Sequence, residues 1–256
     1  MNIDESCTAI VVGGASGMGE ASARMMRERR ASVAILDRDV VRGQAIAREI
    51  GAVFVAADVT EEKSVVRAFG QAREQIGQER ILIHTAGGGE LCQTAWRSAA
   101  GVNRHSFELF EKIVRINLSG TFLSASLSAA GMMTLPSEPG GERGVIVLTS
   151  STTSLDSPSG SVAYGAAKAG INSMALTMAR DLAPEGIRVN TIVPGSFDTP
   201  ILAPVPTEFR KKMLEWALHP KRFGDASEFA SLAFELIQNK FLNAVTVRID
   251  GGARLG

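Results

Sequence analysis

The chain has 256 residues, of which 45% are hydrophobic, and its 27 basic residues balance 27 acidic ones. This length and apolar content suffice for one large core, and α/β domains of this size are routinely single. A formal net charge of zero and the lack of a basic stripe exclude the long-range attraction that draws basic proteins to nucleic acids or anionic membranes.

The first seven residues are acidic and lead straight into an apolar run, unlike a signal or transit peptide. Nowhere does an apolar stretch reach the roughly 20 residues that span a bilayer. The two cysteines, Cys7 and Cys92, have no metal-ligand spacing, so we expect reduced thiols and no bound metal. These features predict a cytoplasmic protein with neither a membrane nor a nucleic-acid partner.

Short runs rich in Val, Ile and Leu alternate with longer segments of helical spacing. The runs are mostly continuous, as is typical of strands covered on both faces. The predicted strands are Thr8–Val12, Ser32–Leu36, Ala52–Ala56, Arg80–His84, Gly144–Thr149, Ile187–Val193 and Ala244–Ile249. Helical segments between them include Met18–Arg29, Glu61–Gly77, Ser106–Leu135 and Val162–Ala183. This order predicts one α/β domain over residues 1–256, a Rossmann-type, doubly wound, parallel seven-stranded sheet with helices on both faces.

Two stretches are predicted to be loops, Pro136–Arg143 and Gly195–Pro206. The second leads into an amphipathic segment, Glu208–Leu218, and we interpret residues 196–220 as a substrate lid. Ligands of doubly wound sheets bind beyond the carboxyl ends of the strands. We therefore expect the chemistry directly after each predicted strand.

A glycine-rich turn follows the first predicted strand, Gly13-Gly14-Ala15-Ser16-Gly17-Met18-Gly19. Its glycines let the backbone turn sharply and approach a pyrophosphate closely, and the helix that follows offers free N–H groups and its positive dipole end. An ordinary tight turn between strand and helix is the plainer interpretation. The position between a predicted strand and a predicted helix favours a dinucleotide site that includes Gly13, Ser16, Gly17, Met18 and Gly19.

Asp37 ends the second predicted strand, 18 residues after Gly19, close to the spacing of an acid that accepts the ribose hydroxyls. A carboxylate there repels a 2′-phosphate, so we expect NAD and regard NADP as the less favoured cofactor. Arg38 favours NADP instead, because an arginine at this place can hold the 2′-phosphate. It can equally be a solvated surface residue.

Two further strand ends match a cofactor site. Asp58-Val59 follows the third predicted strand, where the carboxylate either reaches an adenine amino group or caps the next helix. Ala86-Gly87 follows the fourth predicted strand, where small residues leave room for a cofactor.

Tyr164 and Lys168 stand at i and i+4 of a predicted helix and so share one face. A phenol with a pKa of about 10 is a poor base at neutral pH, and a nearby cation favours the phenolate. Ser151, 13 positions before Tyr164, follows the fifth predicted strand and could bond a substrate oxygen. Asn117 lies within a helical segment, where its amide either holds a relay water next to Lys168 or bonds a neighbouring carbonyl.

Together these residues resemble the short-chain dehydrogenase/reductase family over essentially the whole chain. The resemblance rests on the order and spacing of Gly13-x-x-x-Gly17-x-Gly19, Asp58, Asn117, Ser151, Tyr164-x-x-x-Lys168 and Pro194-Gly195. It implies that Ser151, Tyr164 and Lys168 are catalytic, with Asn117 in the proton relay, and that Tyr164 and Lys168 also contact the cofactor. It implies further that Pro194, Gly195 and Thr199 flank the nicotinamide, that Thr199 bonds its carboxamide, and that the protein is a homotetramer.

A narrower resemblance is to the type-2 3-hydroxyacyl-CoA dehydrogenases, whose relatives also oxidise hydroxysteroids. It rests on Gly140–Ile146, Ala179–Pro184 and Phe241–Asn243. Thr85 departs from the family, since it replaces an asparagine that braces the backbone. His84 before it is interpreted as a strand-end residue rather than a catalytic one, and Gly87–Gly89 as an unusually flexible loop.

The expected function is reversible, NAD-dependent oxidation of a hydrophobic secondary alcohol to a ketone, with a 3-hydroxyacyl-CoA as the leading substrate. A hydroxysteroid or aryl alcohol is the alternative, and a cofactor-binding subunit without catalysis is the alternative of another class. Apolar residues of the lid would cover the substrate or, for about half of them, pack on the core: Phe197, which we also place at the cofactor, Ile201, Leu202, Phe209, Met213 and Trp216.

Overall fold

The computed structural model describes residues 1–203 and 205–254. A seven-stranded sheet in the order β3-β2-β1-β4-β7-β8-β9 forms its centre, and every pairing in it is parallel. The strands are β1 (Thr8–Val12), β2 (Ser32–Asp37), β3 (Val53–Ala56), β4 (Ile81–His84), β7 (Gly144–Thr149), β8 (Ile187–Pro194) and β9 (Thr246–Ile249). All seven predicted strands are confirmed, with ends shifted by at most two residues. The chain order reverses between β1 and β4, the place where such sheets bind their ligands.

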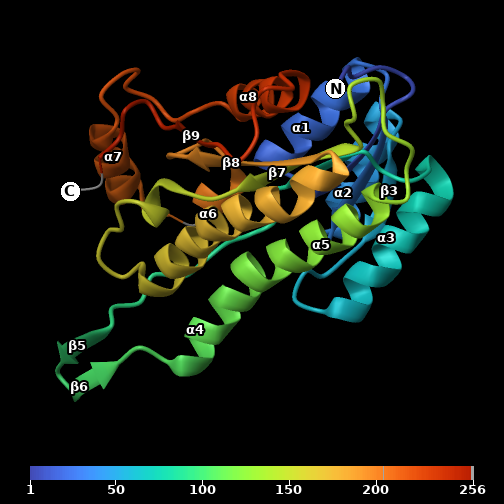
Figure 1. The fold of residues 1–256 in the computed structure, drawn as a ribbon. Coiled ribbons are helices and arrows are strands. Elements are labelled where there is room, and N and C mark those ends of the chain that lie inside the picture. Colours follow the sequence, from blue (N-terminus) through green and yellow to red (C-terminus); the bar gives the residue numbers. More distant parts are fainter. Residues whose placement is uncertain (204, 255–256) are drawn as a thin grey trace.

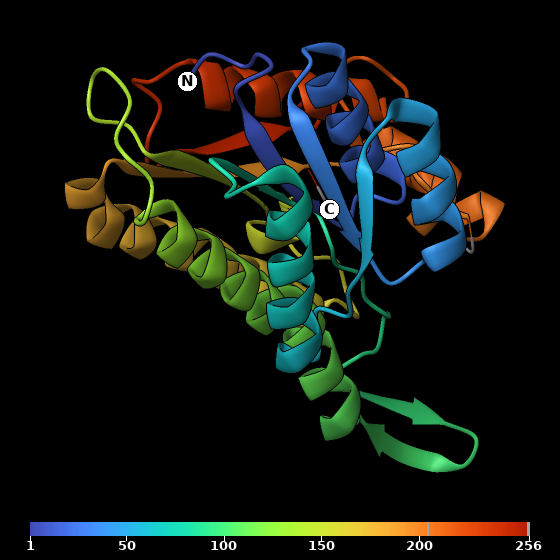
Figure 2. The ribbon, with the colours of Figure 1, turned by 90° about the vertical axis from the view of Figure 1, so that its right-hand side faces the viewer.

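Helices cover both faces of the sheet, so the doubly wound prediction is confirmed (Figures 1 and 2). One face carries α1 (Gly17–Glu28), α2 (Val40–Ile50) and α8 (Ala226–Gln238). The other carries α3 (Glu62–Ile76), α5 (Gly120–Met132) and α6 (Val162–Leu182). The strands divide their side chains between two separate apolar clusters. β4, β7 and β8 are therefore buried throughout, which explains why most of their residues are apolar.

The segment 106–135 is not the single regular helix that its spacing predicts. It contains α4 (Phe107–Val114), a π-helical turn at Arg115–Ser119, and then α5. A π turn holds an extra residue and is common at functional sites. Asn117 is the buried residue of this turn.

An antiparallel hairpin of β5 (Ala95–Ser98) and β6 (Gly101–Arg104) was not predicted from the sequence. It projects from the body beside the start of α4 (Figures 1 and 2). Most of its residues are exposed, so no buried face imposed an apolar pattern on it.

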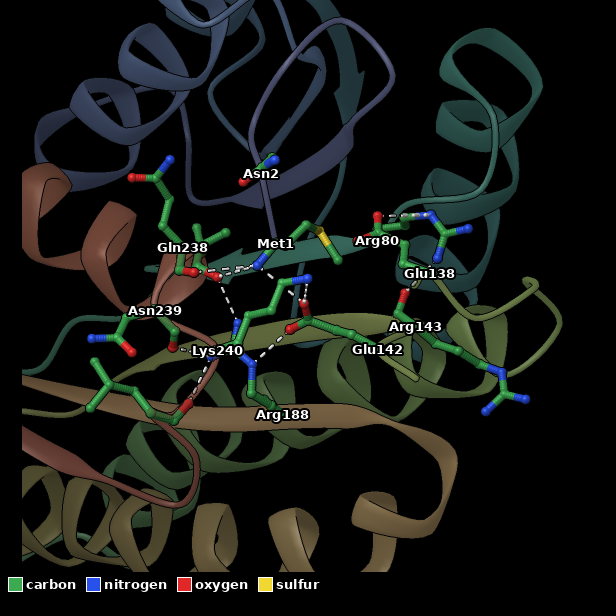
Figure 3. Close-up of polar contacts among 12 residues, drawn as sticks. Met1, Asn2, Arg80, Glu138, Glu142, Arg143, Arg188, Gln238, Asn239 and Lys240 are labelled. Carbon is green, nitrogen blue, oxygen red and sulfur yellow. Dashed lines mark hydrogen bonds and ion pairs between the residues drawn. The ribbon is translucent and has the colours of Figure 1, made fainter. Parts of the chain in front are cut away.

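An ion-pair network closes the amino-terminal edge of the sheet, opposite the ligand-binding edge (Figure 3). The Glu142 carboxylate lies 2.7 Å from Arg188 Nε, 3.1 Å from the α-amino group of Met1 and 3.8 Å from Lys240 Nζ. Arg188 also donates to the carbonyls of Leu236 and Ile237 in the last turn of α8. The network therefore ties α8 to β8 and to the segment before β7.

Within the described ranges, no helix is long and apolar enough to cross a membrane. Cys7 is buried and Cys92 half-buried, and both are free thiols.

Candidate active site

A cleft of about 380 Å³ opens at the carboxyl ends of the strands, beside the reversal of chain order. It falls in the usual size range of small-molecule sites. Eleven of the predicted cofactor residues line it: Gly13, Ser16, Gly17, Met18, Gly19, Asp37, Asp58, Val59, Ala86, Gly87 and Thr199. The structure thus brings the four predicted strand-end motifs together at one edge of the sheet.

The glycines of the first turn are required by close backbone packing. A Cβ added at Gly19 would lie 2.2 Å from the carbonyl oxygen of Gly13. A Cβ at Gly13, whose φ is +82°, would lie 2.5 Å from the amide nitrogen of Ala86. The turn leads directly into α1, whose first residues Gly17, Met18 and Gly19 line the cleft, and the first N–H groups of a helix have no partner within it, as a phosphate site needs. These residues fit a dinucleotide.

Asp37 is held rigidly at the end of β2. Its Oδ2 accepts a hydrogen bond from the Ala15 amide at 3.0 Å, and its Oδ1 one from the Asp39 amide at 2.9 Å. The first bond joins the carboxylate to the glycine-rich turn itself. A negative charge is therefore fixed in the wall of the cleft.

Asp58 forms a tight turn with Thr60 rather than a helix cap. Its Oδ1 accepts from the Thr60 amide at 2.9 Å and from the Thr60 hydroxyl at 2.7 Å, whereas α3 is preceded by Glu61 at its N-cap. The capping interpretation is therefore wrong. The bonds from Thr60, together with the charge of Arg38, lower the pKa of Asp58. Both Asp58 and Arg38 line the cleft.

Tyr164, Lys168 and Ser151 meet where β7 ends and α6 begins. Burial raises the pKa of Tyr164, and a side-chain hydrogen bond with Ser151 lowers it in part. Lys168 Nζ lies 5.6 Å from the centre of the Tyr164 ring and donates to the Thr149 carbonyl at 2.9 Å. Burial lowers the pKa of Lys168 to about 8. Ser151 is thus hydrogen-bonded to the Tyr164 phenol, and Lys168 Nζ lies beside the phenol ring.

Asn117 clamps the loop that follows β4. Its Nδ2 donates to the Gly88 carbonyl at 2.6 Å and to the Ile113 carbonyl at 2.9 Å, and its Oδ1 accepts from the Gly88 amide at 3.1 Å. The bond to Ile113 follows the second interpretation drawn from the sequence, a contact with a neighbouring carbonyl. The two bonds to Gly88 are a further role that the sequence did not indicate.

The loop Gly87–Gly89 runs between the cleft and the catalytic side chains, and the clamp shows that it is held rather than unusually flexible. A Cβ at Gly87 would lie 2.6 Å from Asn117 Oδ1 and 3.2 Å from Lys168 Nζ. A Cβ at Gly89 would lie 3.0 Å from the Tyr164 ring. Glycine is therefore needed here for space.

Thr85 supplies the backbone brace that the sequence comparison expected to be missing. Its hydroxyl lies 3.0 Å from the Val12 carbonyl and 3.2 Å from the Gly13 carbonyl. A hydroxyl on this short side chain reaches the same strand end as an amide would, so β1 and β4 stay joined at the cleft.

Part of the segment 196–220, which was predicted to be a lid, packs on the core. The ring of Phe197 packs edge-on against Phe229 of α8 at 6.4 Å and belongs to the core, as was expected of about half of the apolar residues in this segment. A contact of Phe197 with the cofactor would have to come from its backbone. Leu202 is buried, and the side chain of Ile201 lies outside the described residues.

The helix α7 (Thr207–Trp216) carries the remaining lid residues. Phe209 and Trp216 stack edge-to-face at 5.9 Å and, like Met213, are half-buried. Pro194 ends β8 and Gly195 follows it beside β9, where the Gly195 amide donates to the Ile249 carbonyl. Neither residue lines the described part of the cleft. Thr199 lies against Gly17.

A tyrosine, a buried lysine and a serine lie beside this dinucleotide cleft, across the loop Gly87–Gly89, and do not themselves line it. A dinucleotide cleft next to these three groups is typical of an oxidoreductase that uses a nicotinamide cofactor and acts on CH–OH groups. The chain belongs to the short chain dehydrogenase family, whose model matches residues 7–209. The family resemblance drawn from the sequence is confirmed. An enzyme is therefore favoured over the alternative, a cofactor-binding subunit without catalysis.

Relatives of known name cover nearly the whole chain. It is 39% identical to human 3-hydroxyacyl-CoA dehydrogenase type-2 over 96% of this chain and 95% of that protein. The bovine protein of the same name is 38% identical, with the same coverage. The crystal structure of a 3-hydroxyacyl-CoA dehydrogenase type-2 from Mycobacterium avium superposes with a TM-score of 0.92 at 38% identity, covering 98% of this chain and 97% of that one.

Proposed function

We propose that the protein catalyses the reversible, NAD-dependent oxidation of a hydrophobic secondary alcohol to a ketone, and that its substrate is a 3-hydroxyacyl-CoA. The observation that carries the reaction is the meeting of Tyr164, Ser151 and Lys168 next to the glycine-rich cleft. The names of the relatives support the substrate class.

Each catalytic side chain has a separate task in this reaction. Ser151 bonds the substrate hydroxyl and orients it, and the Tyr164 phenolate removes its proton. Because burial raises the pKa of Tyr164, the phenolate depends on a nearby positive charge, which the Lys168 ammonium supplies. When bound, the nicotinamide accepts the hydride. In the reverse direction Tyr164 returns the proton to the ketone oxygen.

The preference for NAD rests on Asp37. Since two backbone amides fix its carboxylate, it cannot swing away from a 2′-phosphate, and that phosphate would meet a like charge. Arg38 also lines the cleft, and its charge lowers the pKa of Asp58, so the arginine is the group that would favour a 2′-phosphate against Asp37.

A CoA ester needs cations near the mouth of the pocket, and α7 and the residues after it provide four: Lys211, Lys212, Lys221 and Arg222. Lys211 pairs with Glu208 at 2.9 Å and Arg222 with Glu228 at 2.7 Å. Lys212 is exposed, which makes it the first choice for a CoA phosphate.

The test is NADH oxidation by the purified protein with acetoacetyl-CoA, compared with a free keto ester. Faster turnover of the CoA ester supports the proposal, and faster turnover of ketosteroids or aryl ketones would reject it. Tyr164→Phe should remove turnover while NADH binding, followed by fluorescence, persists. Wild-type turnover in that variant would refute the role of the phenol.

We also propose a cytoplasmic homotetramer. Exposed apolar side chains on α4, α5 and α6 (Phe107, Phe122 and Leu176) support contact between subunits, and the free thiols of Cys7 and Cys92 suit a reducing compartment. Light scattering of the purified protein tests the assembly, and localisation of the tagged protein in its cell tests the compartment.

A further inference from the structure

His84 is a buried ionisable residue that the proposed reaction does not use. It is the last residue of β4, and only 1% of it is exposed. In the sheet it pairs with Val12 and Leu148, which face the layer of α5 and α6 (Figure 1). This places the imidazole beside the layer that carries Asn117 and Lys168.

The hydrogen bonds around Thr121 determine which ring nitrogen of His84 carries the proton. The Thr121 hydroxyl, on α5, donates its one hydrogen to the Asn117 carbonyl. His84 Nδ1 lies 3.3 Å from that hydroxyl oxygen. Since the hydroxyl has no second hydrogen to give, Nδ1 must be the donor. His84 Nε2 is therefore the bare acceptor.

His84 Nε2 is buried and has no partner among the described residues. Leaving a buried acceptor unpaired is costly, so native structures retain few of them. The nearby group with protons to spare is Lys168: its ammonium has three donors, and one of them bonds the carbonyl of Thr149, the residue after Leu148. The charge of this ammonium also lowers the pKa of the imidazole, to which burial contributes most.

We propose that His84 is a positioning residue whose bare Nε2 accepts a hydrogen bond from the Lys168 ammonium, through one buried water, and so holds that cation charged beneath Tyr164. A water that bridges two buried polar groups gives nearly the enthalpy of a direct bond. The inference rests on the proposed function, in which Lys168 supports the Tyr164 phenolate.

The arrangement has a consequence for the pH dependence of the reaction. An acceptor that faces an ammonium favours its charged form and so offsets part of the effect of burial on Lys168. Three residues of the neighbouring elements lie around the imidazole: Asn117 in the π-helical turn, Thr121 on α5 and Leu148 on β7. Among the described residues, the charge that acts on the imidazole is that of Lys168, whose Nζ lies 5.6 Å from the centre of the Tyr164 ring. Loss of the acceptor should therefore discharge Lys168 at lower pH and raise the pKa of Tyr164.

Two substitutions of His84 test its two ring nitrogens separately. The amide of His84→Asn reaches about as far as Nδ1 and keeps the contact with Thr121 alone. The amide of His84→Gln reaches about as far as Nε2 and restores the acceptor. For alcohol oxidation, the acidic limb of the profile of kcat/KM against pH should move up by about one pH unit in His84→Asn. At a pH below the limb, this shift is a tenfold loss of kcat/KM. In His84→Gln the limb should return toward the wild-type position.

A second pair tests the tautomer. Thr121→Val removes the acceptor that keeps the proton on Nδ1, so the limb should move as in His84→Asn, whereas Thr121→Ser should retain the wild-type limb. Melting temperature and NADH binding are measured for every variant, because a folding defect would lower both at all pH values.

The pKa of Lys168 itself, from NMR titration of protein with ¹³C-labelled lysines, gives a reading that does not depend on turnover. It should fall in His84→Asn and recover in His84→Gln. If both His84 variants shift the lysine and the limb equally, or neither shifts them, the positioning role is wrong. If the wild type shows no turnover with any alcohol while the lysine still responds as expected, the proposed function fails and the contact stands.

Discussion

Glu142→Gln removes the negative charge at the centre of the ion-pair network (Figure 3) and leaves the side-chain shape unchanged. In the native protein this carboxylate bonds Arg188 Nε at 2.7 Å and pairs with the Met1 α-amino group at 3.1 Å. The side chains of Glu142 and Arg188 are only 8% and 9% exposed. The variant therefore leaves two buried cations, Arg188 and the Met1 α-amino group, without their carboxylate partner.

The expected loss of stability follows from this burial. Breaking a buried ion pair by removing one partner typically costs about 3–5 kcal/mol. Arg188 keeps hydrogen bonds to the carbonyls of Leu236, Ile237 and Leu242, so we expect the lower end, about 3 kcal/mol. At about 2–4 °C per kcal/mol for a chain of this size, the melting temperature should fall by about 6–12 °C.

Thermal unfolding followed by circular dichroism measures this difference. Glu208→Gln is the matched control, because Glu208 pairs with Lys211 on an exposed face of α7 and should leave the melting temperature nearly unchanged. NADH binding should survive in both variants, since the network lies opposite the cleft. A Glu142→Gln protein that melts together with the control would refute the reasoning that this carboxylate holds the edge of the sheet.

Three other predictions concern the site. Burial lowers the pKa of His84 from 6.5 to about 3, so between these values the unfolded chain binds a proton that the folded chain does not. Stability should fall by about 3–5 kcal/mol as the pH drops through this window, and urea unfolding of His84→Gln should show a smaller fall. Gly19→Ala places a Cβ 2.2 Å from the Gly13 carbonyl and should weaken NADH binding at least tenfold in a fluorescence titration. Its control, Gly70→Ala, meets no atom within 4 Å in α3 and should add about 0.5–1 kcal/mol of stability. Asp37→Asn should lower the ratio of kcat/KM for NAD to that for NADP by about tenfold or more, as steady-state kinetics would show; an unchanged ratio would reject the like-charge argument.

The parts of the fold that follow from burial on both faces could be predicted from the sequence. β4, β7 and β8 are mostly apolar because helices cover both of their faces. The catalytic side chains could be found for a related reason. Parallel strands bring their carboxyl ends to one edge, so Ser151 after β7 and the glycines after β1 had to lie near each other.

What the sequence did not indicate depends on contacts between distant residues. The π turn at Asn117 accompanies bonds to Gly88, 29 positions away, and local helical spacing carries no trace of them. The ring of Phe197 turns inward because Phe229 of α8 offers it a partner. The β5–β6 hairpin has no buried face. The local feature that could have indicated it is the short turn that ends at Gly101, whose φ is +120°.

The sheet also acts as a partition between two independent apolar layers. Lys168, Asn117 and His84 stand on the side of α5 and α6, whereas α8 packs on the opposite layer. A mutant library confined to the α8 layer can therefore search for heat resistance without touching the reacting groups. A library in the α6 layer would alter the packing around Lys168, Asn117 and His84, so it would change activity together with heat resistance.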